Sequence, residues 1–477
     1  MAEGGNVLQS YRRFAVNQLA NLGPHLLPFA DVATPSLPLT RLLRLSLFQV
    51  SVGMALVLLV GTLNRVMIVE LSVPASIVAF MISLPIIFAP FRAFIGFRSD
   101  NHVSALGWRR APYVFRGSML QFGGFAVMPF ALLVLSGYMN AGALPPWVGV
   151  VSAAIAFLLV GAGAHIVQTA GLALATDLAT SENQAKVVGL MYVMLLLGMM
   201  ASALIFGHFL ADYSPGRLIR VIQGAAVATL ILNTVALWKQ EPRDRSRAQA
   251  QKQSNNQSQD FAIAWRIFTS GPSAVQRLVI IAFGTLGFGM LDVILEPYGG
   301  QVLGLSVSTT TKLTAVFSLG GLAGLALASR ILSAAPANAM RLAVSGALVG
   351  VPGVFAIQVA ANISSMQLFL GAIAVIGFGA GLFGHGTLTA TMQASPKDQS
   401  GLALGAWGAV QATAAGVAMV LAGVVRDLVL ALSPGSESSI GLAYTVVFLI
   451  EAVFLIAAIF VARSAFSNLH SGRTPSP

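Results

Sequence analysis

The chain has 477 residues, of which 56% are hydrophobic and only 9% are charged, and its mean hydropathy is +0.81. A soluble fold could not keep so apolar a surface solvated, and runs of about 20 apolar residues, the length of a transmembrane helix, recur along the chain. The sequence therefore predicts an integral membrane protein. It contains no cysteine, which excludes disulfides, iron–sulfur clusters and thiolate catalysis.

Residues 1–44 form an N-terminal segment that prolines break into short pieces, and we expect it in the cytoplasm. The segment is mixed and polar and lacks a short apolar core, so we expect no cleavable signal peptide. A first half of six helices follows at residues 45–238. Its expected spans are 45–69, 74–95, 112–136, 147–174, 187–210 and 218–238.

The polar stretch "KQEPRDRSRAQAQKQSNNQSQD" interrupts the apolar runs at residues 239–260. It is too rich in Gln, Ser and Arg to bury a core, so residues 239–275 are predicted to form a cytoplasmic linker. A second six-helix half at 276–462 and a cytoplasmic tail at 463–477 follow it. The expected spans of this half are 276–296, 308–332, 340–360, 365–391, 401–431 and 441–462.

The distribution of Lys and Arg predicts the orientation of the helices. With both termini in the cytoplasm, all but five of the 27 basic residues fall on the cytoplasmic side; the five are Arg65, Arg217, Arg220, Lys312 and Arg426. Cytoplasmic loops of membrane proteins carry such an excess of basic residues. We therefore attribute the net charge of +11 to these loops, and we expect no nucleic-acid partner.

Short matches relate the two halves. "GTL" at 61–63 recurs at 284–286, and "GAG" at 161–163 recurs at 379–381, with a histidine soon after each "GAG". Together with twelve expected spans and a long central loop, these matches in the same order predict two pseudo-symmetric halves. The expected fold class is an all-α integral membrane protein of the major facilitator type, with both termini cytoplasmic.

The loop between the second and third spans reads "GFRSDNHVSALGWRRAPY". It resembles the loop signature of the major facilitator superfamily, with about four extra residues between Asp100 and Gly107. Its charges could latch neighbouring helix ends through salt bridges, with Asp177 as a partner; the alternative is a plain basic anchor. The candidate latch residues are Gly96, Arg98, Asp100, Gly107, Arg109, Arg110 and Asp177.

Asn64 and Arg65 interrupt the apolar first span. A charge at that depth is tolerated when it is paired, and the seventh span carries Asp292 and Glu296 at a comparable depth. We therefore predict that Arg65 pairs with one of these acids and holds the outer side closed. The alternative is that Arg65 extends to the outer interface beside Glu70.

His165 in the fourth span, with Gln168 on the same face, and His385 in the tenth span are candidate pigment-binding residues. Both histidines lie among glycines that would let a planar ligand approach, and a neutral imidazole can bind the magnesium of a chlorophyll. The alternative is an interhelical hydrogen bond. Glu451 lies in the middle of the last span, and the sequence does not assign it a role.

The motifs of common enzymes are missing from the chain. It has no phosphate-binding loop, zinc spacing or nucleophile elbow, which argues against an enzyme. The expected central helices are rich in Gly, Phe and Met and poor in acids, so the ligand of any central cavity is expected to be large and apolar.

Long blocks of the sequence resemble the bacteriochlorophyll delivery family (PucC and LhaA proteins) of the major facilitator superfamily in purple phototrophic bacteria. Among these blocks are "GTLNRVMIVELSVPA", "APFRAFIGFRSDNHVSALGWRRAPY", "GLALATDLATSENQAKVVGLMYVMLLLGM" and "GFGAGLFGHGTLTATM". The likeness extends over about residues 24 to 462. Within the family, we expect the chain to be an LhaA protein in preference to a PucC protein. It implies a multi-pass protein of the bacterial inner or intracytoplasmic photosynthetic membrane.

The resemblance also implies a function. The protein is expected to assemble light-harvesting complex 1, or else complex 2, by delivering or holding bacteriochlorophyll while antenna subunits oligomerise. Expected partners are the antenna α and β polypeptides, and further the reaction-centre core, pigment-synthesis enzymes and membrane lipids. The alternative is a secondary transporter or flippase of an amphipathic tetrapyrrole or isoprenoid compound.

Overall fold

A computed structural model describes residues 34, 37–85, 108–137, 144–180, 183–241, 274–334, 339–394, 400–433 and 438–470. These residues form helices joined by short connections. The helices of the first half are α2 (Leu39–Leu45), α3 (Leu47–Leu56), η2 (Val57–Leu63), η3 (Val66–Glu70), α4 (Ala75–Ser83), α6 (Ala111–Leu135), α7 (Pro146–Leu178), α8 (Gln184–Phe209) and α9 (Pro215–Leu237). Those of the second half are α12 (Ala274–Gln301), α13 (Val307–Ala334), α14 (Ala339–Asn362), α15 (Met366–Gln393), α16 (Ser400–Leu432) and α17 (Ser438–His470).

Eleven stretches within the described ranges are long and apolar enough to cross a membrane, and each coincides with an expected span. The remaining expected span, 74–95, begins with α4, and its residues 86–95 lie outside the described residues. The predicted multi-span helical fold is thereby confirmed. Most of the linker, 242–273, also lies outside the described residues, and the cytoplasmic position of the termini stays a prediction.

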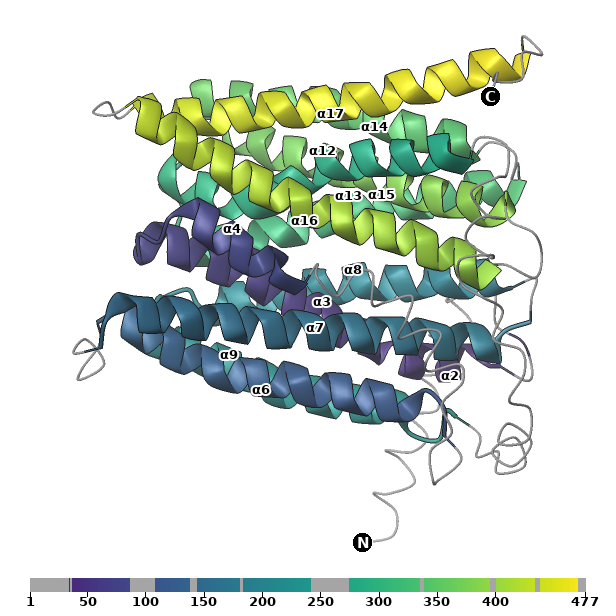
Figure 1. The fold of residues 1–477 in the computed structure, drawn as a ribbon, viewed down its shortest axis with the longest axis horizontal. Coiled ribbons are helices and arrows are strands. Elements are labelled where there is room, and N and C mark those ends of the chain that lie inside the picture. The colour runs from purple at the N-terminus through teal and green to yellow at the C-terminus, as the bar shows by residue number, and fades with distance from the viewer. Residues whose placement is uncertain are drawn as a thin grey trace, which may run out of the picture.

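The helices divide into two bundles that lie side by side in Figure 1, α2 to α9 below and α12 to α17 above. Closely packed helix pairs include α6 with α7 in the first bundle and α14 with α15 in the second. Glycine makes the first of these contacts possible, because a Cβ atom on Gly163 would lie only 2.7 Å from the backbone nitrogen of Gln121. The bundles meet through α4 against α16 and α8 against α13.

The first transmembrane helix has two different segments. The first segment, α2 and α3, is α-helical, whereas η2 and η3 are π-helical turns separated by Asn64 and Arg65. Wider π-helical turns are rare and occur frequently at functional sites. This π-helical segment contacts both α12 and α13, so the first helix crosses from its own bundle to the opposite one.

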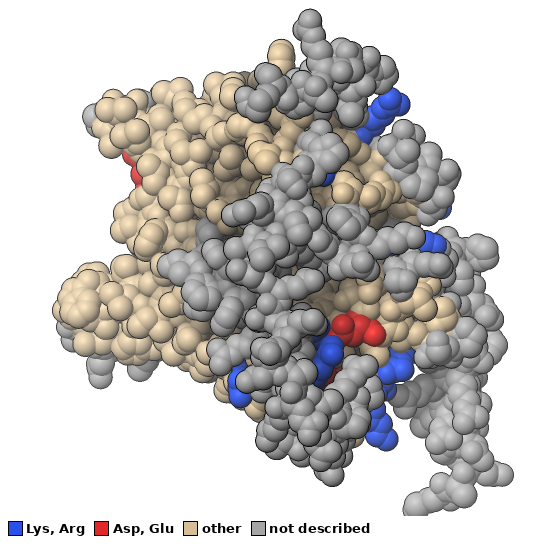
Figure 2. Space-filling model, turned by 45° about the vertical axis from the view of Figure 1, so that its right-hand side comes forward, with Lys and Arg blue, Asp and Glu red and all other residues tan. Residues whose placement is uncertain are grey.

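Basic side chains gather at one end of the bundles. Among them, Arg41 and Arg44 lie at the start of the first helix, Arg109 and Arg110 precede α6, and Arg341 lies at the start of α14. Most of the Lys and Arg atoms visible in Figure 2 lie toward the end of the molecule that is turned to the viewer. This end is the one that the sequence predicts to be cytoplasmic. We call it the basic end, and the opposite end, where Glu70 lies, the outer end.

Candidate functional site

The candidate site is a cavity of about 420 Å³ between the two halves. This volume is within the range of small-molecule sites, roughly 300–1,000 Å³. The first helix, α7 and α8 line it from one side, and α12, α13, α15 and α16 from the other. Most of its wall is apolar; the larger apolar residues include Leu56, Leu59, Leu195, Leu196, Met199, Phe288, Phe317, Phe383 and Met419.

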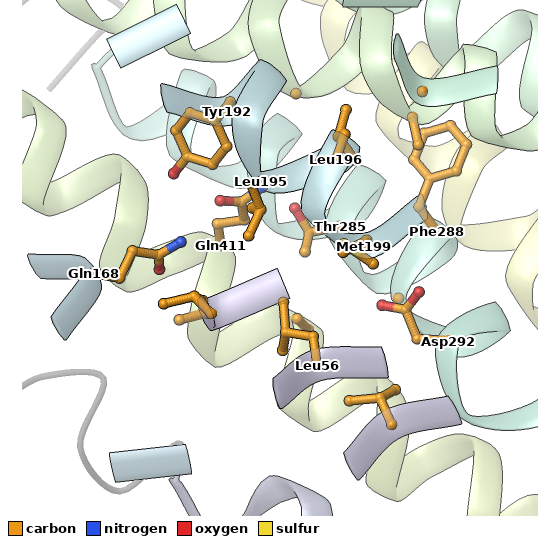
Figure 3. A pocket seen from close by; sticks show the side chains of 18 of the residues that line it. Leu56, Gln168, Tyr192, Leu195, Leu196, Met199, Thr285, Phe288, Asp292 and Gln411 are labelled. Atoms are coloured by element: carbon orange, nitrogen blue, oxygen red, sulfur yellow. The ribbon is translucent and has the colours of Figure 1, made fainter. Parts of the chain in front are cut away.

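A few polar side chains interrupt this apolar wall at two places. Figure 3 shows Gln168, Tyr192 and Gln411 turning their polar ends toward one region, whereas the carboxyl group of Asp292 lies on the other side of the cavity. Leu56 and Leu195 are among the apolar side chains between them. The cavity is therefore amphipathic, with an apolar middle and hydrogen-bonding groups at both sides.

His165 and His385 line this same cavity, one from each half. His385 is only 7% exposed, and both histidines also take part in other interactions within the protein. Gln168 lines the cavity too, and its amide donates to Oε1 of Gln49 at 3.3 Å. The structure thus brings together the three residues that the sequence proposes for pigment binding. In the described portion of the chain, no three His, Asp or Glu side chains converge on a possible metal site.

Several cavity residues were not identified from the sequence. Trp407 donates from Nε1 to the hydroxyl of Thr387 at 3.1 Å, and its ring meets that of Tyr192 edge-on at 6.0 Å. This contact joins the two halves beside the cavity. Tyr192 and Gln411 are isolated polar residues in expected spans, which is the signal that could have identified them.

Toward the outer end, hydrogen bonds between the halves close the cavity. Asn64 donates from its amide to the carbonyl of Val293 at 2.6 Å, and the hydroxyl of Ser308 donates to the carbonyl of Gly207 at 2.6 Å. The Val293 carbonyl has a specific need for a donor. Four residues later α12 contains Pro297, which has no N–H to complete the helical hydrogen bond. Asn64 therefore fills a position that the proline leaves open.

Arg65 lies in this closed region, but its carboxylate partner is not the predicted one. It forms an ion pair with Glu70 of its own helix and donates from Nη2 to the carbonyl of Leu305 at 3.1 Å. Within the described residues it makes no ion pair with Asp292 or Glu296. The prediction of a direct pair between the first and seventh spans is therefore corrected.

The acids of α12 have other surroundings. Asp292 faces the cavity, and Glu296 accepts a hydrogen bond from the hydroxyl of Thr314 at 2.9 Å. Glu70 is 36% exposed at the outer end, so pairing with it brings the charge of Arg65 toward the interface. The contact of Arg65 with the second half is made through a backbone carbonyl.

Tyr213, in the connection between α8 and α9, lies near the Arg65–Glu70 pair. Burial, and secondly the negative charge of Glu70, raise the pKa of its hydroxyl to about 12, although Arg65 acts in the opposite direction. The hydroxyl therefore stays protonated across the physiological pH range, and Arg65 keeps a single charged partner here.

Glu451 lies behind the cavity wall. Its side chain is fully buried, and neither carboxyl oxygen has a hydrogen-bond partner among the described residues. Its electrostatic neighbour is Asp292. Because no cation of the described residues balances the two groups there, a negative charge on Glu451 would be costly.

At the basic end, Asp177 accepts hydrogen bonds from both arginines of the loop sequence. Nη2 of Arg109 lies 2.8 Å from its Oδ2 atom, and Nε of Arg110 lies 3.1 Å from the same atom. Glu241, not predicted, accepts from the backbone nitrogens of Arg109 at 2.6 Å and Ala111 at 2.8 Å, and so caps the start of α6. The other candidate latch residues, Gly96, Arg98, Asp100 and Gly107, lie outside the described residues.

Two helical bundles around a central cavity define a membrane protein of the major facilitator type. Solved structures agree with this class. A bacterial homolog of the human lysosomal transporter Spinster, inward-facing and unoccupied, superposes with a TM-score of 0.65 at 15% identity, covering 94% of this chain and 100% of that chain. A D-xylose–proton symporter gives a TM-score of 0.65 at 15% identity, covering 88% of this chain and 96% of that chain.

Sequence comparison places the chain more narrowly. Residues 62–468 match the PUCC protein family. Protein PucC of Rhodovulum sulfidophilum is 61% identical over 87% of this chain and 91% of its own length. Protein PucC of Rhodobacter capsulatus is 58% identical over 93% of this chain and 96% of its own length. The chain belongs to the PUCC protein family.

The hydrogen bond from Asn64 to Val293 can be tested by a double-mutant cycle. Asn64→Leu should destabilise the protein by about 1–3 kcal/mol, because the Val293 carbonyl then lacks a donor. Pro297→Ala restores a backbone N–H in α12, so the double variant should recover some of this loss. Thermal unfolding in detergent measures the effect. Equal losses in Asn64→Leu with and without Pro297→Ala would contradict the assignment.

The Arg65 pair gives a second prediction. Glu70→Leu leaves the buried guanidinium without its carboxylate, and breaking a buried pair typically costs about 3–5 kcal/mol; here we expect the lower end, because Glu70 is partly exposed. The double variant Arg65→Leu, Glu70→Leu should recover some of the loss. Folded yield and thermal stability measure it. If the double variant Arg65→Leu, Asp292→Leu recovered the loss instead, the result would support the pair between Arg65 and Asp292 that the sequence predicts.

Proposed function

We propose that this protein is an assembly factor of photosynthetic light-harvesting antenna that holds bacteriochlorophyll in its central cavity. The observation that carries the proposal is the amphipathic cavity with a histidine from each half. Membership of the PUCC protein family supports it, as do the PucC names of its relatives. The proposed location of the protein is the inner or intracytoplasmic membrane of a phototrophic bacterium.

The chemistry of the cavity suits a large tetrapyrrole. Apolar walls bury a macrocycle favourably, and an imidazole nitrogen of His165 or His385 would bind its magnesium. Gly384, beside His385, leaves open space where any side chain would stand. The polar groups at the ring periphery would form hydrogen bonds with Gln168, Tyr192 and Gln411. The magnesium supplies the Lewis-acid centre that such a ligand set recognises.

In this proposal the protein does no covalent chemistry. It keeps the pigment out of the lipid phase until antenna α and β polypeptides accept it, with the reaction-centre core and pigment-synthesis enzymes as further candidate partners. The antenna served is proposed to be light-harvesting complex 1, with complex 2 as the other client. A deletion strain separates the two, because only the client antenna should be lost from the membrane spectrum.

A secondary transporter or flippase of an amphipathic tetrapyrrole or isoprenoid is the second candidate. The similarity of the fold to transporters favours it, and so does the closure of the cavity at the outer end. Closure at one end of a central cavity is what one state of an alternating-access cycle requires.

Purification from a phototrophic host distinguishes the two functions. We expect protein isolated in a mild detergent to carry bacteriochlorophyll absorption and to co-purify with antenna polypeptides identified by mass spectrometry. Pigment-free, partner-free protein that moves a tetrapyrrole across proteoliposomes would contradict the assembly role and favour the transporter.

Cavity variants test the pigment site itself. The double variant His165→Leu, His385→Leu should lose most of the co-purifying pigment because both imidazole ligands are removed, and Gly384→Leu should do the same by filling open space. His208→Leu, outside this cavity, is the matched control. Pigment per protein, measured by absorbance, is the readout, with membrane abundance checked in parallel. Unchanged pigment in the double variant would exclude the histidines as ligands.

A further inference from the structure

A second cavity, of about 820 Å³, lies on the first half between α8 and α9. These consecutive helices share α3 as a neighbour but otherwise pack on different helices, because α9 lies mainly against α6 whereas α8 lies mainly against α13. They diverge as a result, and Met54 of the first helix lies between them in the groove that remains. None of the residues that line this groove lines the central cavity.

The groove is apolar along one stretch and charged along the other. Its apolar wall is formed by Met54, Ile205, Phe206, Phe209, Val221, Gly224, Ala225 and Ala228. Its polar wall is formed by Ser202, His208, Asp212, Arg217 and Arg220. The charged stretch lies at the outer end of α8 and α9, and the apolar stretch extends toward their middle.

The dimensions of the groove match one leaflet of a bilayer. From Arg217 to Ala228 along α9 is a distance of about 17 Å at the rise of an α-helix. This is about half of the ~30 Å hydrocarbon thickness of a membrane. A molecule with a charged head at Arg217 and Arg220 would therefore reach the middle of the bilayer with its apolar chain at Ala228.

At the corresponding place in the second half, aromatic rings join α12 and α17. There α12, α16 and α17 pack on one another, and the ring of Tyr298 meets those of Tyr444 at 5.4 Å and Phe448 at 5.2 Å. In the first half, small residues on α9 leave the space open, and a Cβ on Gly224 would have no neighbour within 4 Å. The groove is therefore a property of this half and does not follow from the fold alone.

The charges of the groove do not balance. Arg217 pairs with Asp212 at 2.8 Å, but Arg220 donates only to the carbonyl of Gly216, at 3.4 Å, and in the portion of the chain that the structure describes it makes no ion pair. Two arginines against one aspartate leave one positive charge. A ligand with one negative charge would compensate it.

We propose that this groove binds an anionic phospholipid, with its phosphate on Arg220 and an acyl chain along Ala225 and Ala228. A lipid combines the features that the groove requires, which are a negative head group at the interface and an apolar chain as long as a single leaflet is thick. A neutral amphiphile would leave the charge of Arg220 unbalanced, and a small anion would leave the apolar wall uncovered.

Native mass spectrometry of the full-length protein in a neutral detergent tests the proposal. We expect the wild type to retain phosphatidylglycerol in preference to phosphatidylcholine with the same chains. Arg220→Gln should weaken phosphatidylglycerol retention roughly tenfold, the scale of one charge-assisted hydrogen bond, and remove the preference. Gly224→Leu should reduce retention of both lipids by filling the groove. Inorganic phosphate alone should not displace the lipid.

Two variants serve as controls. Gly371→Leu also places a side chain in open space, and Arg330→Gln removes an exposed charge near the basic end of α13. Neither residue lines the groove, so neither variant should change lipid retention. An unchanged lipid preference in Arg220→Gln would overturn the head-group assignment. Unchanged retention in folded Gly224→Leu would overturn the groove. Displacement by millimolar phosphate would overturn the lipid assignment in favour of an anion site that does not recognise the chain.

Discussion

The hydrogen bond that Asn64 donates to the carbonyl of Val293 fixes how the first helix meets α12 at the outer end. In hydrocarbon, each backbone carbonyl needs a donor within the protein, because no water is available. Pro297 removes the donor that α12 would supply, and an amide from the first helix replaces it. A gap in the bonding of one half is thus filled by the other, which joins the halves at the outer end and sets the limit of the cavity.

Polar groups in the described spans are distributed according to the contacts they can make. Those at the outer end, such as Arg65 and Ser308, bond to partners on the same helix or on the other half of the protein. Those in the cavity, such as Gln168 and Asp292, face an open space, where a ligand could use them. Because intramembrane polar residues are costly, the polar groups that face the cavity are candidates for ligand binding.

The pseudo-symmetry of the halves makes their differences informative. Both use a closely packed helix pair, α6 with α7 and α14 with α15, and both contribute a histidine to the cavity. They differ beside the last helix of each half, where Tyr444 and Phe448 fill the second half but Gly224 and Ala225 leave a groove in the first. The same backbone plan therefore leaves a surface groove between α8 and α9 in the first half.

The sequence by itself determined the membrane class, the helical spans and the likeness between halves, because hydropathy and helix length are local properties of the chain. It also identified His165, Gln168 and His385 as candidate pigment-binding residues, and the structure places all three on one cavity. Only the tertiary structure decided which partners polar groups meet. Arg65 pairs with Glu70 because side-chain reach and interface depth, which sequence spacing does not specify, favour the nearer acid. Likewise the groove between α8 and α9 arises from the divergence of two helices, and packing alone sets that divergence.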